Sequence, residues 1–290
     1  MSSLKGVLVT TASHPVVKAA RKRADELRFR LWQARLAEEP VLERPIFMIG
    51  APRSGTSVAV SLFAMHPWVA NRTEAGLLWD PAHFFDPEAD HYWGPDRVTE
   101  QDARRLHAWF EFYRQKGRKK RLINKHPRNS VRIEYIRKIF PDAFFIHVIR
   151  DGRAVASSIV NRTRKEPYRH SIPFGNFCRP PGWRELLRDD PYEQAALQWR
   201  EIVRYVLARR HELGDRYHEF KYEEMCARPR EILAAAFEFS ELPVSEEVLL
   251  QLPHSLPNMN HKYEEQLSPD RIRAVTQVQG ELLQELGYHV

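Results

Sequence analysis

Hydrophobic residues along the chain gather in short runs of strand length, and each run is followed by a segment with helical spacing. Residues 45–50 are an apolar run, and an apolar helix is expected over 56–65. Residues 143–149 form the clearest run, which continues without a break into Arg150. Continuous apolar runs of this length are typical of strands buried on both faces of a sheet.

The same pattern predicts the remaining elements. Strands are expected at 121–124 and 216–222, and helices at 15–38, 73–85, 98–116, 128–140, 153–164, 190–213, 228–238 and 268–285. Strands that alternate with helices indicate a parallel, doubly wound sheet. We therefore expect an α/β fold of three layers, with a central, mostly parallel sheet flanked by helices. A single domain over 1–290 fits this length, with a helix in its N-terminal part, 1–40.

Residues 165–190 interrupt the alternation. This stretch holds four prolines, two glycines and several aromatic residues. A long irregular segment inside a compact domain is usually functional. We interpret residues 165–190 as a lid or as a loop that binds an acceptor.

Composition narrows the class of protein. The 290 residues include 45 lysines and arginines against 38 acidic residues, a net charge of +7, which favours an anionic partner. Two cysteines are too few for a disulfide framework or a zinc site, and no metal site is expected. The apolar runs are too short to span a membrane, and the first residues lack the apolar core of a secretory signal. These features predict a cytoplasmic protein.

The loop at 50–57 carries the first candidate chemistry. Gly50 and Gly55 have the spacing of a nucleotide-binding P-loop, between a predicted strand and a predicted helix. Such a loop directs backbone N–H groups and the positive end of a helix dipole at an anion. Loops that bind ATP have lysine directly after the second glycine, but here that residue is Thr56, and the basic residue is Arg53. The pattern predicts an anion site without the NTP-specific lysine; the alternative is a glycine-rich turn with no ligand.

A second cationic cluster follows the strand at 143–149. Arg150 lies at the carboxyl end of this strand, where open α/β sheets bind ligands. Ser158 and Arg162 are four residues apart and share one face of the next helix. Two anion sites at neighbouring strand ends suit a nucleotide with phosphates at two positions on its ribose. The alternative is that Arg150 pairs with Asp151 or Glu74.

With these two sites, the sequence resembles the PAPS-dependent sulfotransferases, nearest the bacterial branch that is also similar to the tyrosylprotein sulfotransferases. The resemblance runs from about Pro45 to the C-terminus. It is carried, in order, by residues 52–57, 124–127, 140–143, 150–158, 221–224, 262–267 and 286–288. Each motif is short, but their common order is specific.

The resemblance implies a donor and a set of residues that bind it. The donor is 3′-phosphoadenosine 5′-phosphosulfate (PAPS), and the sulfuryl group passes in line to an acceptor hydroxyl or amine without a metal. The 5′-phosphosulfate would be held by Arg53, Ser54, Gly55, Thr56 and Ser57. The 3′-phosphate would be held by Arg150, Ser158 and Arg162, with Tyr222 and Lys262 near the nucleotide.

Catalytic roles follow from the same likeness and from the logic of phosphoryl transfer. Lys125 is expected at the bridging oxygen, where charge builds up, beside Arg53. Glu74 is the favoured general base, since its separation from Arg53 is similar to that in the tyrosylprotein branch. His126 is the rival base, but neighbours on a strand face opposite ways, so His126 and Lys125 would point apart.

Three functions remain open on the sequence alone. The first is a sulfotransferase, the second an ATP-dependent small-molecule kinase on the related P-loop frame, and the third a binding protein that retains the fold without catalysis. The acceptor is open among small molecules, glycans, lipids and peptides. The basic run at 116–121 is interpreted as a solvated turn before a strand, and no nucleic-acid partner is expected.

Overall fold

Five parallel strands form the centre of the protein. The computed structural model describes residues 15–290. Within them the sheet has the order β2-β3-β1-β4-β5, and every neighbouring pair is parallel. The strands are β1 (Ile46–Ile49), β2 (Val69–Thr73), β3 (Arg121–Lys125), β4 (Phe144–Ile149) and β5 (Tyr217–Lys221). The parallel sheet predicted from the sequence is confirmed.

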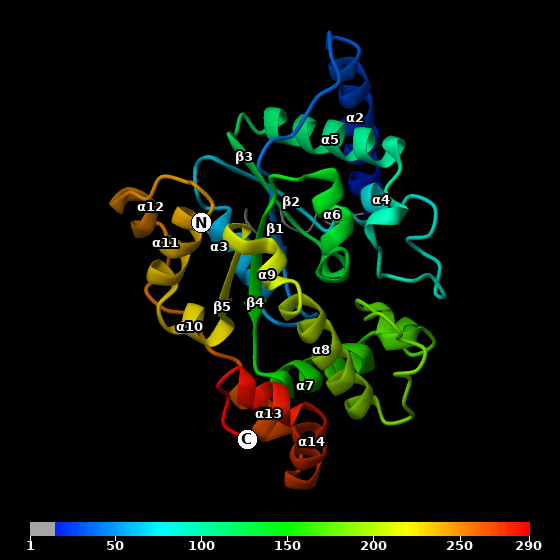
Figure 1. Cartoon of the computed structure of the whole chain (residues 1–290), viewed down its shortest axis with the longest axis vertical. Helices are drawn as coiled ribbons and strands as arrows, with labels where there is room; N and C mark the ends of the chain where they lie inside the picture. Colours follow the sequence, from blue (N-terminus) through cyan, green and yellow to red (C-terminus); the bar gives the residue numbers. More distant parts are fainter. Residues whose placement is uncertain (1–14) are drawn as a thin grey trace.

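Helices cover both faces of this sheet, so the three-layer architecture is also confirmed (Figure 1). One face packs against α3 (Thr56–Phe63), α10 (Tyr222–Ala227) and α11 (Pro229–Phe239). The other face packs against α5 (Glu100–Lys116), α6 (Ile133–Ile139) and α8 (Pro191–Leu207). In β1, Ile46 and Met48 enter the first core while Phe47 and Ile49 enter the second, because successive side chains alternate across a strand.

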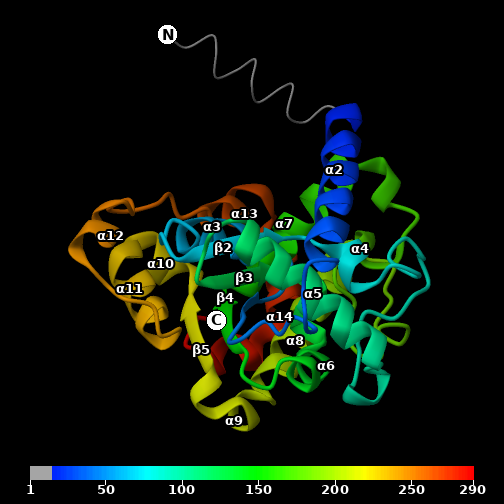
Figure 2. The same cartoon turned by 90° about the horizontal axis from the view of Figure 1, so that it is seen from above.

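A further group of helices lies beyond the carboxyl end of β4. It contains α7 (Gly152–Lys165), α13 (His261–Gln266) and α14 (Pro269–Glu285), which pack together and against α8. At the opposite end of the molecule, α2 (Pro15–Gln33) stands out from the body and packs on α5, where Phe29 stacks on Trp109 (Figure 2). The part of the predicted N-terminal region 1–40 that precedes Pro15 lies outside the described residues. Short helices complete the chain: α4 (Gly76–Trp79), α9 (Arg210–Leu213) and α12 (Glu246–Leu250).

Several predicted boundaries were wrong, each for a local reason. The predicted helix over 73–85 is reduced to α4, because Glu74 has a left-handed φ of 50° and Asp80 precedes a proline. The predicted helix over 128–140 is broken at Arg132, with φ −131°, into the 3-10 helix η2 (Pro127–Val131) and α6. The helix expected at 15–38 ends at Gln33, and the one expected at 190–213 is divided into α8 and α9.

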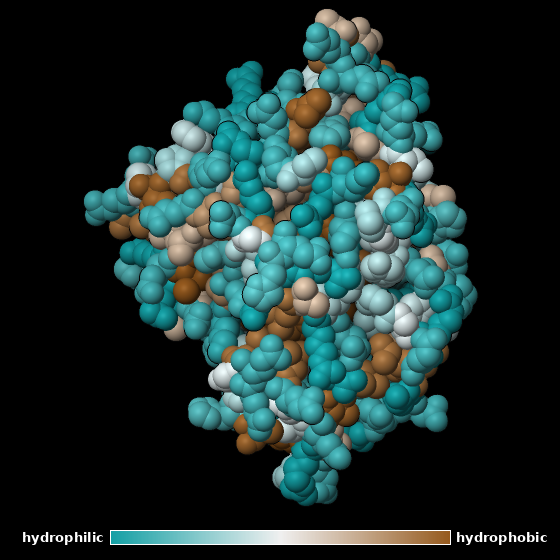
Figure 3. All heavy atoms as spheres, viewed as in Figure 1, coloured by the Kyte–Doolittle hydropathy of each residue, from teal (hydrophilic) through white to brown (hydrophobic). Residues whose placement is uncertain are grey.

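Residues 165–190 are largely irregular, as expected, with two 3-10 turns, η3 (Pro167–Arg169) and η4 (Pro173–Asn176). Phe174, Cys178 and Trp183 of this segment are buried, so the segment is anchored to the body by apolar packing. Most of the face in Figure 3 is hydrophilic, with apolar side chains scattered between the charged ones. Among the described residues, none of the helices combines the length and the hydropathy needed to cross a bilayer.

Candidate active site

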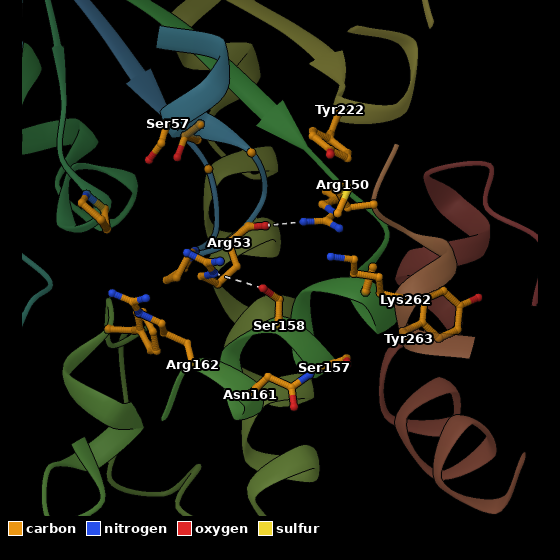
Figure 4. Close-up of a pocket in the computed structure, with 18 of the residues that line it drawn as sticks. Arg53, Ser57, Arg150, Ser157, Ser158, Asn161, Arg162, Tyr222, Lys262 and Tyr263 are labelled. Carbon is orange, nitrogen blue, oxygen red and sulfur yellow. Dashed lines mark hydrogen bonds between the residues drawn. The ribbon is translucent and has the colours of Figure 1, made fainter. Parts of the chain in front are cut away.

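The carboxyl ends of the strands open into one cavity of about 780 Å³. Most of the residues predicted to bind or react with a nucleotide line it: Arg53, Gly55, Thr56, Ser57, Glu74, Lys125, Arg150, Ser158, Arg162, Tyr222 and Lys262. Figure 4 shows Arg53 and Arg162 on one side of the cavity, Arg150, Tyr222 and Lys262 on the other, and Ser158 between them. The parallel sheet explains this convergence, because all of its strands end at the same edge.

The loop between β1 and α3 has the backbone of an anion cradle. Gly55 has a φ of 89°, and a Cβ atom there would lie 2.4 Å from the ring of Tyr222. A Cβ atom at Gly50 would lie 2.6 Å from the carbonyl oxygen of Val148. Glycine is therefore required at both positions, where other parts of the chain approach the loop closely. Ser54 is fully buried behind the loop, and its side chain does not line the cavity.

Arg53 bridges the loop and α7. Its backbone is left-handed, with a φ of 71°, and its Nε donates a hydrogen bond to Oγ of Ser158 at 3.0 Å (Figure 4). Burial, followed by the charges of Arg162 and Arg150, lowers the pKa of Arg53 below its usual value. The cavity therefore holds an excess of positive charge that an anion would neutralise.

Arg150 is the most constrained of the cationic residues. Its Nη1 donates to the main-chain oxygen of Arg53 at 2.9 Å, its Nε donates to Oδ1 of Asn260 at 2.9 Å, and its guanidinium lies 4.5 Å from the centre of the Tyr222 ring. The same Asn260 donates to Glu223, which also accepts from the backbone N–H of Asp151. These contacts leave part of the guanidinium fork facing the cavity.

Neither alternative partner of Arg150 holds. Asp151 pairs with Arg153, with 2.7 Å between Oδ2 and Nη2, and its side chain caps the N-terminus of α7. Glu74 pairs with Lys125.

Glu223 is held from a second side as well, because the hydroxyl of Tyr288 donates to its second carboxylate oxygen at 3.0 Å. Arg162 lines the cavity but pairs with Glu166, on the irregular segment that follows α7.

Lys125 and Glu74 face each other at the ends of two adjacent strands. The distance between Nζ of Lys125 and Oε1 of Glu74 is 2.7 Å, and the backbone N–H of Glu74 donates to the carbonyl oxygen of Lys125 at 2.8 Å. The Lys125 side chain is 4% exposed and that of Glu74 is 61% exposed. A buried ammonium thus meets a carboxylate that is open to the cavity.

His126 points away from this pair, as the alternation along a strand predicts. It is buried and does not line the cavity, and its Nδ1 accepts the backbone N–H of Arg128 at 3.2 Å, which caps η2. Burial and the charges of Arg132, Arg128 and Lys125 hold the pKa of His126 well below its usual value. A neutral histidine with one nitrogen used as a helix cap is a structural group in this conformation.

Comparison with known proteins decides the family. A model described as "Sulfotransferase family" matches residues 45–246, more than half of the chain. The chain belongs to the sulfotransferase family. It is 23% identical over 262 residues to a protein-tyrosine sulfotransferase of Drosophila melanogaster, which covers 83% of this chain and 49% of the relative. It is also 25% identical over 204 residues to the nodulation protein NoeE of Sinorhizobium fredii, which covers 64% of this chain and 47% of the relative. The chain thus spans less than half of the length of each of these two relatives.

Solved structures support the fold of the chain. Sulfotransferase STF9 from Mycobacterium avium superposes with a TM-score of 0.55 and 19% identity, over 86% of this chain and 78% of its own. The sulfotransferase domain of the Synechococcus PCC 7002 olefin synthase also reaches 0.55, with 19% identity over 88% of this chain and all of its own. Both likenesses concern the fold, a parallel sheet between helical layers.

The cavity also contains residues that the sequence did not single out. They come from α7, from the 165–190 segment, from the start of α8, and from α13 and the residues just before it: Asn161, Arg164, Lys165, Phe177, Tyr192, Met259, Tyr263 and Gln266. Gln266 accepts hydrogen bonds from Ser157 at 3.1 Å and from Asn161 at 2.6 Å, which joins α13 to α7. Helical spacing from Ser158 could have indicated Asn161, whereas Tyr263 and Gln266 lay in a motif of the resemblance without an assigned role. Among the described residues, no group of three His, Cys, Asp or Glu side chains is placed to hold a metal ion.

Proposed function

We propose that this protein transfers a sulfuryl group from PAPS to an acceptor hydroxyl or amine. The observation that carries the proposal is the charge of the cavity at the strand ends. Seven cationic side chains and one carboxylate line it: Arg53, Lys125, Arg150, Arg162, Arg164, Lys165, Lys262 and Glu74. Membership of the sulfotransferase family supports the reaction.

The division of the positive charge suits a nucleotide with phosphates at separate positions. We assign the glycine loop, with Arg53, to the 5′-phosphosulfate and Arg150 with Ser158 to the 3′-phosphate. Arg150 and Tyr222 line the side of the cavity opposite Arg162 (Figure 4). Guanidinium groups suit this task because their planar fork matches phosphate oxygens. Thr56 stands where an ATP-binding loop carries lysine, which argues against a kinase.

Lys125 and Arg53 would stabilise the charge that develops during transfer. PAPS supplies an activated sulfuryl group when it is bound. Lys125 is the buried cation nearest to Glu74, so we assign its ammonium group to the bridging oxygen of the donor. Positive groups fixed in advance around a reacting centre lower its barrier at little reorganisation cost.

Glu74 is the base in this proposal. Its carboxylate lines the cavity and is more than half exposed, so an acceptor hydroxyl has direct access to it. Its pairing with Lys125 has to loosen when the ammonium turns to the donor, which frees Glu74 to accept a proton. We favour Glu74 over His126, because His126 is buried, electrically neutral and outside the cavity.

The acceptor would enter beside Glu74 and the 165–190 segment. Phe177 of that segment and Tyr192 of α8 line the same cavity as the cationic residues, which supports an acceptor-binding loop within one domain. The acceptor is to be identified among small molecules, glycans, lipids and peptides. We also propose a cytoplasmic setting, supported by two cysteines that are both free and buried.

Two measurements on the purified chain test this function. Calorimetry with adenosine 3′,5′-bisphosphate should detect binding, and Arg53→Gln or Arg150→Gln should weaken it. A donor-consumption screen across phenols, sugars, amines and peptides should then show turnover that depends on Glu74. Selective stabilisation by ATP·Mg²⁺, with none by the bisphosphate, would favour a kinase instead. Bisphosphate binding without turnover on any acceptor, unchanged in Glu74→Ala, would favour a non-catalytic binding protein.

A further inference from the structure

Three arginines, Arg128, Arg132 and Arg179, are buried outside the nucleotide cavity. Arg128 and Arg132 belong to η2 and its C-terminal end, and Arg179 belongs to the 165–190 segment. Arg132 and Arg179 are fully buried, and Arg128 is 4% exposed. Arginine is rarely buried without an ion pair for each charge, so this cluster requires an explanation.

Each guanidinium makes one hydrogen bond to the main chain of a single loop. Arg128 donates to the carbonyl oxygen of Phe84 at 3.1 Å, Arg132 to that of His91 at 3.0 Å, and Arg179 to that of Ala89. The three arginines therefore all contact the main chain of the segment 84–91.

The remaining buried guanidinium nitrogens have no hydrogen-bond partner within the described part of the protein. They are Nη1 of Arg128, Nη1 and Nη2 of Arg132, and Nε and Nη2 of Arg179. All of these atoms are donors, because a guanidinium has no acceptor. Leaving buried charged donors unpaired costs more than leaving neutral ones unpaired.

His91 adds one more donor to this group. Its Nδ1 accepts the backbone N–H of Arg179 at 3.0 Å, so the neutral ring carries its proton on Nε2. That Nε2 is buried and also has no partner in the described residues. Burial, followed by the charges of Arg128, Arg179 and Arg132, lowers the pKa of His91 far below its usual value, so the ring is neutral. The main-chain oxygen of His91 also accepts from Nε of Arg132.

Of the acidic residues that act on the three arginines, Asp80 is buried, whereas Asp86, Glu88 and Asp90 are exposed, and their charges partly offset the lowering of the Arg179 pKa by burial. In residues 15–290, the one ion pair of the three arginines joins Nη2 of Arg132 to Oδ2 of Asp80, at 4.0 Å. The thiol of Cys178 is buried beside the arginines, but burial raises its pKa to about 12 and keeps it neutral. Burial also lowers the pKa of Arg132 to about 9, with a further contribution from Arg128. Three buried acceptors also lack a hydrogen-bond partner in the described residues: Oδ2 of Asp80, which is charged, and Asn129 Oδ1 and Gln198 Oε1, which are neutral.

We propose that Arg128, Arg132, Arg179 and Nε2 of His91 form an internal binding site for a small inorganic anion of the size of chloride. An anion among these donors would accept several charge-assisted hydrogen bonds and offset part of the buried positive charge. The site is separate from the nucleotide cavity, because none of its four residues lines that cavity. The inference is independent of sulfuryl transfer.

The site would join three segments that are distant in sequence. Segment 84–91 supplies the carbonyl oxygens, η2 follows directly after Lys125 and His126, and Arg179 lies two residues after Phe177 of the cavity wall. The bound anion would therefore hold the 165–190 segment against the part of the chain that carries Lys125.

Bromide tests the site directly on the unmodified chain. Crystals grown without halide and soaked in sodium bromide should show an anomalous peak within hydrogen-bond distance of Arg132 and Arg179. Ordered water molecules on these donors, with no anomalous peak, would overturn the proposal. This measurement needs no variant, so it does not depend on whether a substituted chain folds.

Thermal unfolding provides the second test. The melting temperature of the wild type should rise by several degrees, and saturate, when sodium gluconate is replaced by sodium chloride at constant ionic strength. Arg132→Gln should reduce this chloride response, and Arg184→Gln should retain it, since Arg184 is an exposed neighbour that pairs with Asp90. Equal melting temperatures in both salts for the wild type would contradict the proposal.

Discussion

Arg150 holds the backbone of Arg53. Its Nη1 donates to the main-chain oxygen of Arg53 at 2.9 Å, while the Arg53 side chain reaches across to Ser158 on α7. Each of the two proposed anion sites therefore supplies a contact that shapes the other. The left-handed backbone of Arg53, with a φ of 71°, is held in this arrangement.

This coupling makes Arg150 more sensitive to substitution than a simple charge would be. Arg150→Lys keeps the charge but loses the fork that contacts Arg53 and Asn260 at the same time. Since a hydrogen bond to a charged group contributes about 1.5–3 kcal/mol, affinity for adenosine 3′,5′-bisphosphate should fall roughly ten- to hundred-fold. Calorimetry measures the change. Arg273→Gln, at an exposed site on α14, is the control and should leave the affinity unaltered. If Arg150→Lys bound the bisphosphate as tightly as the wild type does, the two contacts of the guanidinium fork would not be needed for binding.

The two candidate bases make opposite predictions. Glu74→Gln removes the carboxylate from the cavity, so the transfer rate should fall by about 10²–10⁴ with little change in bisphosphate affinity. His126→Asn keeps an acceptor for the backbone N–H of Arg128 and should retain most of the rate. Donor-consumption kinetics on the acceptor found in the screen measure both. If His126→Asn lost turnover at an unchanged melting temperature while Glu74→Gln stayed active, His126 and not Glu74 would be the base.

Gly55 is required for two reasons that a pair of variants can separate. Gly55→Ala places a methyl group 2.4 Å from a ring carbon of Tyr222 and also forces alanine to a φ of 89°. Gly287→Ala, at a φ of 72°, meets only the end of the Lys221 side chain at 3.5 Å. Both variants should lose about 1–2 kcal/mol from the left-handed backbone. Chemical denaturation should show a larger loss of unfolding free energy for Gly55→Ala than for Gly287→Ala, and Gly55→Ala should also bind the bisphosphate more weakly. Equal losses of unfolding free energy in the two variants, with intact binding, would mean that the Tyr222 ring moves away from the new methyl group at little cost.

His147 should make the protein less stable in acid. Burial lowers its pKa to about 3, and its Nδ1 lies 2.7 Å from the hydroxyl of Tyr217. The unfolded chain takes up a proton near pH 6.5 but the folded chain does not, so this residue makes the free energy of unfolding fall as the pH drops from about 6.5 to 3. The slope contributed is about 1.4 kcal/mol per pH unit.

Urea denaturation at pH 4.5 and 7.5 measures this contribution. His147→Asn should show a smaller difference in unfolding free energy between the two pH values than the wild type shows. His211→Asn, at an exposed position on α9, serves as the matched control and should behave as the wild type does. An unchanged difference in His147→Asn would indicate that this ring is protonated in the folded protein.

Sequence pattern predicted the elements that are buried on both sides. β1, β3 and β4 are continuous apolar runs in the middle of the sheet, and their limits differ from the predicted ones by one or two residues. β2 was missed because it is an edge strand of the sequence VANRT, in which only the first two residues are buried. An edge strand with one open side need not carry the apolar signal on which the prediction depends.

The candidate site was predictable to the extent that it follows strand ends. Lys125, Arg150 and Tyr222 each lie at the end of a strand, Arg53 lies in the loop after β1, and the parallel order of the sheet brings them together. Gln266 reaches the cavity only because α13 packs on α7, which no local pattern encodes. The buried arginines likewise depend on the path of the 84–91 loop, which has no regular structure to predict.

Glu223 makes the end of the chain a structural support of nucleotide recognition. One of its carboxylate oxygens accepts from Asp151 and Asn260, and the other accepts from the Tyr288 hydroxyl. Shortening the chain before Tyr288 would release this carboxylate, and with it the asparagine that orients Arg150. Expression designs that trim residues after α14 would therefore weaken a binding pocket whose sequence they leave intact.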